Sequence, residues 1–148
     1  MGALTLPAGG LVYVDTQILI YTVERHPAYE PVLRPLWEAA QDGDVEAVSS
    51  DLTLMETLVS PLRSGDAALQ ADYERALLGT DLRLLPLTQV VLREAARLRA
   101  SIPGLRTPDA LHAATALLSG CALFVTNDRG FRRVAGLPLV LLDDVLAS

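Results

Sequence analysis

The sequence predicts an α/β fold, a three-layer α/β/α sandwich around a mostly parallel central sheet of about five strands. Short runs rich in apolar residues, typical of buried strands, alternate with longer segments whose apolar residues have helical spacing. The chain has 148 residues and is 51% hydrophobic, enough for one domain with a substantial core. Its single cysteine, Cys121, excludes an internal disulfide framework and a zinc site built from several thiolates.

Strands and helices are expected in alternation in the first half of the chain. The expected strands span residues 11–14, 45–49 and 82–85. The expected helices span residues 17–23, 29–41, a segment from about residue 50, and 66–78. Asp42-Gly43 is expected to end the second of these helices, and Pro61 with Ser64-Gly65 the third.

The second half repeats this alternation. Thr88 is the expected N-cap of a helix that runs to about Ala100. Thr107-Pro108 predicts the start of the next helix, with Thr107 as N-cap and proline at the first helical position. Strands are expected over residues 122–126 and 137–142. In parallel α/β sheets, ligands bind beyond the carboxyl ends of the strands, so residues at those ends are the candidates for chemistry.

Charge and composition exclude several classes of function. The 12 basic residues are all arginine, which excludes a P-loop, Schiff-base chemistry and a Ser–Lys nucleophile pair. The net charge of −6 argues against a protein that coats nucleic acid through bulk electrostatics, but not against an enzyme that cuts it.

No membrane segment or leader is expected. The first ten residues have no basic residue before their apolar stretch, unlike a signal peptide. Residues 110–125 are strongly apolar, but His112 and Ser119-Gly120 interrupt them, so we interpret them as a helix and a buried strand. The expected location is the cytoplasm.

Four acidic residues occupy the positions where such a fold places its chemistry. Asp15 and Asp128 come just after expected strands, Asp109 lies in the first turn of its helix, and Glu56 lies among apolar residues. Each alone has an ordinary explanation: a helix N-cap for Asp15, a turn residue for Asp128, a charge at a helix terminus for Asp109 and a solvent-facing side chain for Glu56.

Taken together, these acids indicate a cation site. Crowded carboxylates repel and raise one another's pKa unless a divalent ion compensates them, and oxygen-only ligands suit Mg²⁺ or Mn²⁺. Without these four, 14 of the 18 acidic residues remain against 12 basic ones, so the acidity of the chain is largely local if the four converge.

The segments around these acids resemble, in order and spacing, the signatures of PIN domains, most closely the VapC-like toxins of prokaryotic toxin–antitoxin pairs. The matching segments are Val12–Thr16, Leu54–Leu58, Pro108–Ala116 and Phe124–Phe131. The resemblance covers about residues 11–143. It implies one PIN-like nuclease domain over residues 11–148, preceded by an extension, residues 1–10, to which we assign no role.

The resemblance also implies a function. In that family the four acids bind one or two Mg²⁺ or Mn²⁺ ions and hydrolyse RNA phosphodiester bonds, leaving 5′-phosphate and 3′-hydroxyl ends. It further implies a small antitoxin that blocks the acidic cleft, and a homodimer. The chain departs from the family at Gln17, where members often carry asparagine. Because the amide is kept, we expect altered positioning rather than lost activity.

Supporting roles are open to several neighbours of the acids. Thr16, Gln17, Thr126 and Asn127 can hydrogen-bond a metal-bound water or a phosphate, or serve only as turn and strand-end residues. His112 is a candidate general base, although a packed, hydrogen-bonded histidine is the simpler interpretation. Four arginines near the acids can hold RNA phosphates or be plain surface charges: Arg106, Arg129, Arg132 and Arg133.

The sequence therefore predicts a metal-dependent endoribonuclease in which Asp15 and Asp109 are the principal ligands and Glu56 and Asp128 complete the cluster. Two alternatives stay open: a housekeeping nuclease that processes RNA without a toxin role, and a non-catalytic PIN-like module that binds RNA or protein. The presence of all four acids counts against the second alternative.

Overall fold

A five-stranded, all-parallel sheet forms the centre of the computed structural model, which describes residues 2–148. The strands lie in the order β3-β2-β1-β4-β5, so β1 is central. Their bounds are Leu11–Val14 (β1), Glu46–Ser50 (β2), Arg83–Leu85 (β3), Leu123–Thr126 (β4) and Leu139–Leu141 (β5). Because every pairing is parallel, the strands all end at the same edge of the sheet.

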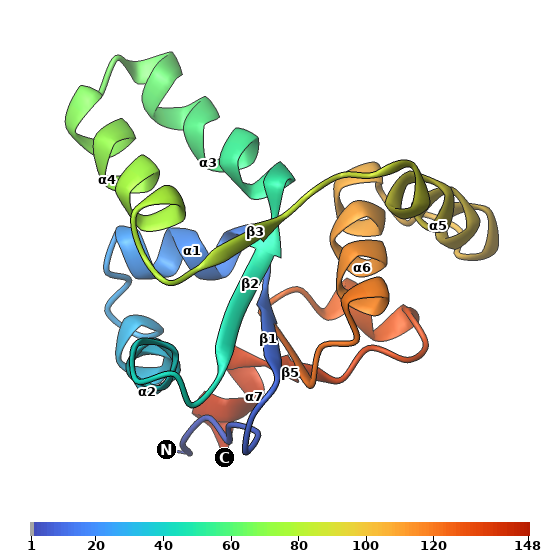
Figure 1. Cartoon of the computed structure of the whole chain (residues 1–148), viewed down its shortest axis with the longest axis horizontal. Helices are drawn as coiled ribbons and strands as arrows, with labels where there is room; N and C mark the ends of the chain where they lie inside the picture. Colours follow the sequence, from blue (N-terminus) through green and yellow to red (C-terminus); the bar gives the residue numbers. More distant parts are fainter. Residues whose placement is uncertain (1) are drawn as a thin grey trace.

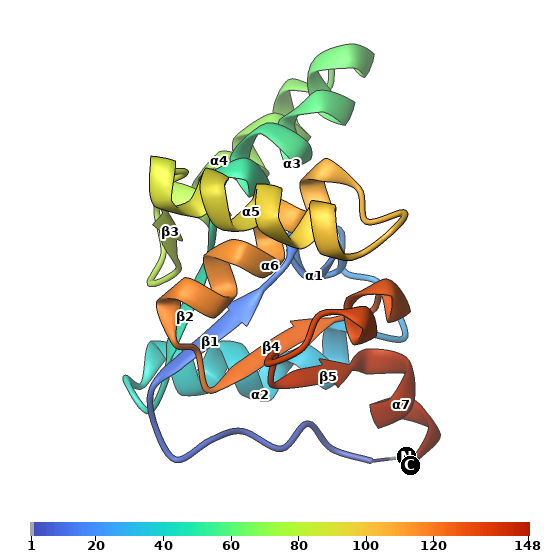
Figure 2. The same ribbon diagram turned by 90° about the vertical axis from the view of Figure 1, so that its right-hand side faces the viewer.

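Helices cover both faces of this sheet (Figure 1), which confirms the three-layer prediction. The bounds are Thr16–Val23 (α1), Glu30–Gln41 (α2), Asp51–Ser64 (α3), Ala67–Leu78 (α4), Gln89–Ser101 (α5), Thr107–Ser119 (α6) and Leu142–Ala147 (α7). Helices α1, α2 and α7 lie against one face and α5 with α6 against the other, while α3 and α4 rise beyond the sheet as a hairpin (Figure 2).

The alternation of side chains along β1 divides the core into two clusters. Val12 and Val14 point into a cluster with residues of α1, α2 and α7, whereas Tyr13 joins a cluster with residues of α5 and α6. All three side chains are fully buried. A strand buried on both faces holds the residue that follows it, Asp15, in a fixed position at the sheet edge.

Several helix boundaries differ from the sequence-based expectations. The expected N-cap Thr107 is already helical: Arg106 has the extended backbone of the cap position, and the Thr107 hydroxyl accepts instead from Arg99 at 2.8 Å. Pro61 lies inside α3 and does not end it; the helix continues to Gly65, whose left-handed backbone forms the C-cap.

The C-terminal region differs most from the prediction. The turn expected after β4 is a short 3₁₀ helix, η1 (Arg129–Arg133), with Asp128 as its N-cap. The last expected strand is shorter and passes directly into α7, a helix that the apolar run of residues 137–142 concealed. Buried Leu142 and Val145 dock α7 on the core.

The expected N-terminal extension, residues 1–10, is described from residue 2 on. It has no helix or strand there, yet buried Leu4 and partly buried Leu6 pack on the core cluster next to α7. The two ends of the chain lie side by side in both views (Figures 1 and 2).

Across residues 2–148, the helices are too short or too polar to cross a membrane.

Candidate active site

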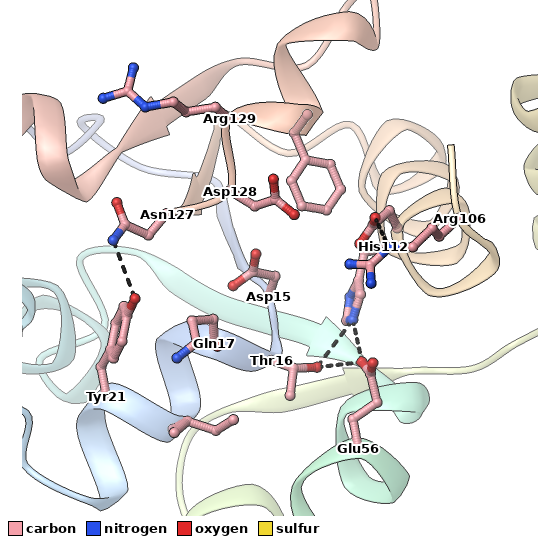
Figure 3. Close-up of a pocket in the computed structure, with 13 residues that line it drawn as sticks. Asp15, Thr16, Gln17, Tyr21, Glu56, Arg106, His112, Asn127, Asp128 and Arg129 are labelled. Atoms are coloured by element: carbon pink, nitrogen blue, oxygen red, sulfur yellow. Dashed lines mark hydrogen bonds and ion pairs between the residues drawn. The ribbon is translucent and has the colours of Figure 1, made fainter. Parts of the chain in front are cut away.

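One cavity brings together all four acidic residues that the sequence singled out. It has a volume of about 630 Å³ and lies beyond the carboxyl ends of β1 and β4 (Figure 3). Its walls are formed by Asp15, Thr16, Gln17, Ile20, Tyr21, Glu56, Arg106, Asp109, His112, Asn127, Asp128, Arg129 and Phe131. The residues come from four separate stretches of the chain, so only the fold makes them neighbours.

Asp15 is the most buried of the four acids, at 4% exposure. Its Oδ1 accepts from the backbone N–H of Ile18 at 3.3 Å and so caps α1, and its Oδ2 accepts from the Thr126 hydroxyl. The ordinary explanation of Asp15 as an N-cap is therefore correct, and the same side chain also lines the cavity.

Burial makes the charge on Asp15 costly. It raises the pKa of this carboxyl from 3.8 to about 6, against the opposing effects of nearby His112 and the hydrogen bond from Thr126. A buried carboxylate facing a polar cavity is stabilised by any cation that enters the cavity.

Glu56 is partly exposed, but it faces the cavity and is held there by other side chains, which its ordinary explanation does not foresee. Its Oε1 accepts from the Thr16 hydroxyl at 2.6 Å and lies 2.8 Å from Nε2 of His112 (Figure 3). Burial raises the pKa of Glu56, but the hydrogen bonds from His112 and Thr16 outweigh it, so the pKa lies below its usual value. Glu56 is thus held as a carboxylate.

His112 is a packed, hydrogen-bonded residue with 3% exposure. While Nε2 faces Glu56 and Thr16, Nδ1 lies 2.7 Å from the Tyr13 hydroxyl. Burial, with Asp15 nearby, raises the pKa of Tyr13 well above its usual value, so the hydroxyl keeps its proton. Both ring nitrogens are engaged, which favours the packed interpretation over a free general base.

Asp109 lies in the first turn of α6, where the helix dipole stabilises its charge. Its Oδ2 accepts from Nε of Arg106 at 3.3 Å. The Arg106 side chain is 74% exposed, so solvent screens this ion pair. Arg106 can therefore exchange Asp109 for another anion at little cost.

Asp128 is exposed, and its role in the fold is local. Its Oδ1 accepts from the backbone N–H of Gly130 at 2.8 Å, and its own N–H donates to Thr126 at 3.0 Å. The neighbouring Asn127 ties the cavity wall together: its amide donates to the Tyr21 hydroxyl at 3.2 Å, and its carbonyl accepts from the backbone of Asp143 at 2.9 Å.

The four candidate arginines fall into two groups. Arg106 and Arg129 line the cavity. Arg132 and Arg133 do not: Arg132 pairs with Asp144 at 2.8 Å, and Arg133 donates to the backbone carbonyls of Gly130 and Pro103. Arg129 also approaches Asp144, at 3.8 Å.

Sequence reasoning missed Tyr13, Tyr21 and the hydroxyl groups behind Thr16. Thr16 Oγ1 lies 3.2 Å from Thr53, which lies 2.8 Å from Ser49. The sequence did contain an indication of them: these polar residues lie within elements expected to be buried, and a buried tyrosine or serine hydroxyl needs a hydrogen-bond partner. Within residues 2–148, every buried polar side-chain atom has one.

The donor set fits a hard divalent cation, although the carboxylates are not gathered around one point. Among residues 2–148, no three His, Cys, Asp or Glu side chains are close enough to form a metal cluster as they stand. The cavity nevertheless presents four carboxylates and no thiolate, and such oxygen ligands suit Mg²⁺ or Mn²⁺.

The family follows from a direct match of the sequence. The PIN domain family model matches residues 12–137, which contain all four acids. The chain belongs to the PIN domain family. No curated protein matches the sequence.

Several solved structures share this fold. VapBC2 from Rickettsia felis, bound to a promoter DNA fragment, superposes with a TM-score of 0.72 at 20% identity, over 88% of this chain and 98% of that chain. FitAcB from Neisseria gonorrhoeae gives a TM-score of 0.68 at 18% identity, over 88% and 97%. VapC20 from Mycobacterium tuberculosis, a toxin that cleaves the sarcin–ricin loop, gives 0.68 at 18%, over 86% and 97%. At these identities the likeness is one of fold.

Proposed function

We propose that this PIN domain is a divalent-metal-dependent endoribonuclease and the toxin of a toxin–antitoxin pair. The observation that carries the proposal is the single cavity lined by Asp15, Glu56, Asp109 and Asp128, with the buried Asp15 between strand β1 and helix α1. A non-catalytic module could cap α1 with a neutral asparagine or serine, whereas a metal site accounts for a buried carboxylate whose charge opposes folding.

Asp15 and Asp109 would be the principal metal ligands, and Glu56 and Asp128 would complete the set directly or through water. The chemistry that Mg²⁺ or Mn²⁺ supplies when bound is Lewis-acid activation of water and of the scissile phosphate. The protein's own contribution is orientation: Thr126 and the α1 backbone fix Asp15, and Thr16 with His112 fixes Glu56. No protein nucleophile is required.

Arg106 and Arg129 are the side chains best placed to bind RNA phosphates, because both line the cavity. Arg106 would exchange its exposed pairing with Asp109 for a phosphate oxygen when that carboxylate turns to a cation. Such local contacts offset the unfavourable net charge of −6. Arg132 and Arg133 are weaker candidates, since both already have partners outside the cavity.

A small antitoxin and a second copy of the chain are the proposed protein partners, in the cytoplasm. The neighbours VapBC2 and a toxin–antitoxin complex from Klebsiella pneumoniae support the antitoxin. An apolar groove of about 420 Å³, lined by Leu19, Trp37 and Leu82 among others, is of a kind that accepts a peptide segment. Exposed Met55 and Leu62 on α3 support the homodimer.

The test is cleavage of a cellular RNA pool by the purified chain, with the ends of the fragments sequenced. We expect Mg²⁺-dependent cuts that leave 5′-phosphate and 3′-hydroxyl ends. Asp15→Asn, purified in the same way, is the control for contaminating nucleases. Intact RNA after incubation with the parent chain would contradict the proposed activity.

A further inference from the structure

A buried line of hydrogen bonds runs behind the cavity and ends on Glu56. It starts at Tyr13 in the middle of β1, whose hydroxyl lies 2.7 Å from Nδ1 of His112 on α6. On the other edge of the imidazole, Nε2 lies 2.8 Å from Oε1 of Glu56 on α3. Three elements that are far apart in the sequence are thereby joined through side chains alone. Figure 3 shows the part of this line between His112 and Glu56.

The anchor of this line is rigid. The Tyr13 ring is fully buried and stacks on Phe124 of the neighbouring strand, with ring centres 5.1 Å apart and an angle of 4° between the planes. His112 meets the Tyr13 ring edge-on at 6.0 Å and is itself buried. Glu56, by contrast, is a long side chain with several rotatable bonds, on a helix that rises beyond the sheet. A flexible ligand gains most from a fixed hydrogen-bond partner, because ordering costs rotamer entropy.

The chemistry of the groups fixes the direction of these bonds. A carboxylate only accepts, so Nε2 of His112 carries a proton and donates to Glu56, and in the neutral ring Nδ1 accepts from the Tyr13 hydroxyl. Oε1 of Glu56 accepts from Thr16 as well, at 2.6 Å. Within residues 2–148, no hydrogen bond reaches Oε2. One carboxylate oxygen is therefore held by two donors, and the other is available to the cavity.

We propose that His112, itself held by Tyr13, is a positioning residue that fixes Glu56 so that Oε2 serves as a ligand for the divalent cation. The inference rests on the proposed function and goes beyond it by assigning a role to His112 and Tyr13, which are not among the four acidic residues. It also explains why both imidazole nitrogens are engaged: the ring orients a ligand and takes no proton from the substrate.

Three substitutions separate this role from simple packing. In His112→Gln, the side-chain amide N–H reaches about as far as Nε2 and can still donate to Glu56. In His112→Asn, the amide stops near the position of Nδ1 and loses Glu56. Both are polar, but asparagine is the smaller and leaves the larger void, so a third variant that leaves the packing at position 112 intact is needed to separate the hydrogen bonds from packing. Tyr13→Phe keeps the stacked ring and removes only the hydroxyl that holds His112.

The experiment is a titration of each variant with Mn²⁺ alone, with the unbound ion followed by electron paramagnetic resonance and folding checked by circular dichroism. We expect His112→Asn to bind Mn²⁺ about 10- to 100-fold more weakly than the parent, the range for lost outer-shell partners. His112→Gln should stay close to the parent, and Tyr13→Phe should fall between the two. Equal affinities in the Asn and Gln variants, whether unchanged or equally weakened, would overturn the proposal.

A second readout needs neither metal nor substrate. Nitrogen-15 spectra of the parent should show the His112 proton on Nε2, and a neutral ring protonated on Nδ1 instead would overturn the proposal even if a variant failed to fold. Failure of the proposed function has a different signature: the parent then cuts no RNA, while the Mn²⁺ pattern across the variants and the position of the proton remain as expected.

Discussion

The two sides of the cavity hold their acids in different ways. On the buried side, Asp15 and Glu56 are fixed by side chains from other parts of the chain, namely Thr126, Thr16 and His112. On the exposed side, the one hydrogen bond to the Asp128 side chain within residues 2–148 comes from the backbone of η1, two residues away. Asp109 occupies an intermediate position, with its partner Arg106 three residues before it.

On the buried side, contacts between distant parts of the chain fix the acids, whereas on the exposed side local turn and helix geometry does. Oxygen atoms on the buried side are placed before any ligand arrives. For Asp15 this placement lowers stability, because burial opposes its charge. On the exposed side, water solvates the carboxylates and the nearby arginines, so these groups can rearrange around RNA at little cost. Substitutions should therefore affect stability mainly on the buried side and affinity for RNA mainly on the exposed side.

Asp15→Asn should have the largest effect on both activity and stability. We expect RNA cleavage to be abolished, because a principal metal ligand is lost. The metal-free protein should become more stable at pH 7, by up to about 2–3 kcal/mol, which is the free energy corresponding to a pKa raised from 3.8 to about 6. The asparagine can still cap α1.

The pH dependence of this gain has a definite sign. A carboxyl whose pKa is raised by folding destabilises the protein at high pH, and that penalty disappears as pH falls through about 6 towards 4. Denaturant unfolding at several pH values should thus show the two proteins converging between pH 6 and 4. A variant that is less stable than the parent at pH 7, or one that retains cleavage, would contradict this assignment.

Replacing the two cavity arginines should have the next largest effect, on RNA binding rather than on folding. Arg106→Ala with Arg129→Ala should weaken binding by about 1–3 kcal/mol and lower the salt dependence, which for the parent should correspond to roughly two to four phosphate contacts. Binding is titrated at several salt concentrations with Ca²⁺ in place of Mg²⁺ to suppress cleavage.

Arg132→Ala is the matched control for this pair. Arg132 lies near the same edge of the molecule but pairs with Asp144 and does not line the cavity. Its loss should leave affinity and salt slope unchanged. If Arg132→Ala weakened RNA binding as much as the double variant, the division of the arginines into cavity and outer groups would be wrong.

Glu56→Gln should have a smaller effect on stability, opposite in sign to that of Asp15→Asn. The pKa of Glu56 is lowered in the folded protein, because hydrogen bonds from His112 and Thr16 outweigh burial. Its ionised form therefore stabilises the fold above its unfolded pKa of about 4.3, and that contribution is lost as pH falls through the folded pKa. The variant should be less stable than the parent at pH 7 and approach it at low pH.

The smallest effect is expected at the exposed acid. Asp128→Asn keeps the cap on Gly130, so the free energy of unfolding should change by less than about 0.5 kcal/mol. Cleavage should fall, but less than in Asp15→Asn. Thermal unfolding and cleavage of the same RNA measure both, and a loss of stability at Asp128 comparable to that at Glu56 would remove the contrast between the two sides.

The sequence predicted the framework well because local rules dominate there. Alternating patterns placed the strands, and Thr88 caps its helix as expected. Thr107 failed as a cap because it lies inside the helix, where Arg99 binds its hydroxyl, and α7 was hidden because its first residue, Leu142, continues an apolar run. The first failure depends on a side-chain contact that the local pattern does not record, and the second on an apolar run that does not mark where the strand ends.

The same distinction applies to the site. The four acids could be located because each follows a strand, begins a helix or interrupts an apolar face, and the fold brings all of them to one cavity. The link from Tyr13 through His112 to Glu56 could not be located, because it joins residues 99 and 56 positions apart. Whether Gln17, which lines the cavity and is exposed, alters the metal geometry stays a prediction.

We infer that the acidic cavity cuts RNA with the help of a divalent cation, and metal removal with add-back separates this mechanism from metal-free cleavage. A labelled RNA is incubated with the purified chain after treatment with EDTA, and then with Mg²⁺, Mn²⁺ or Zn²⁺ restored. We predict no cleavage in EDTA, recovery with Mg²⁺ or Mn²⁺, and poor recovery with Zn²⁺, because the cavity offers hard oxygen ligands and its one histidine is already engaged. Full cleavage in EDTA would contradict the claim.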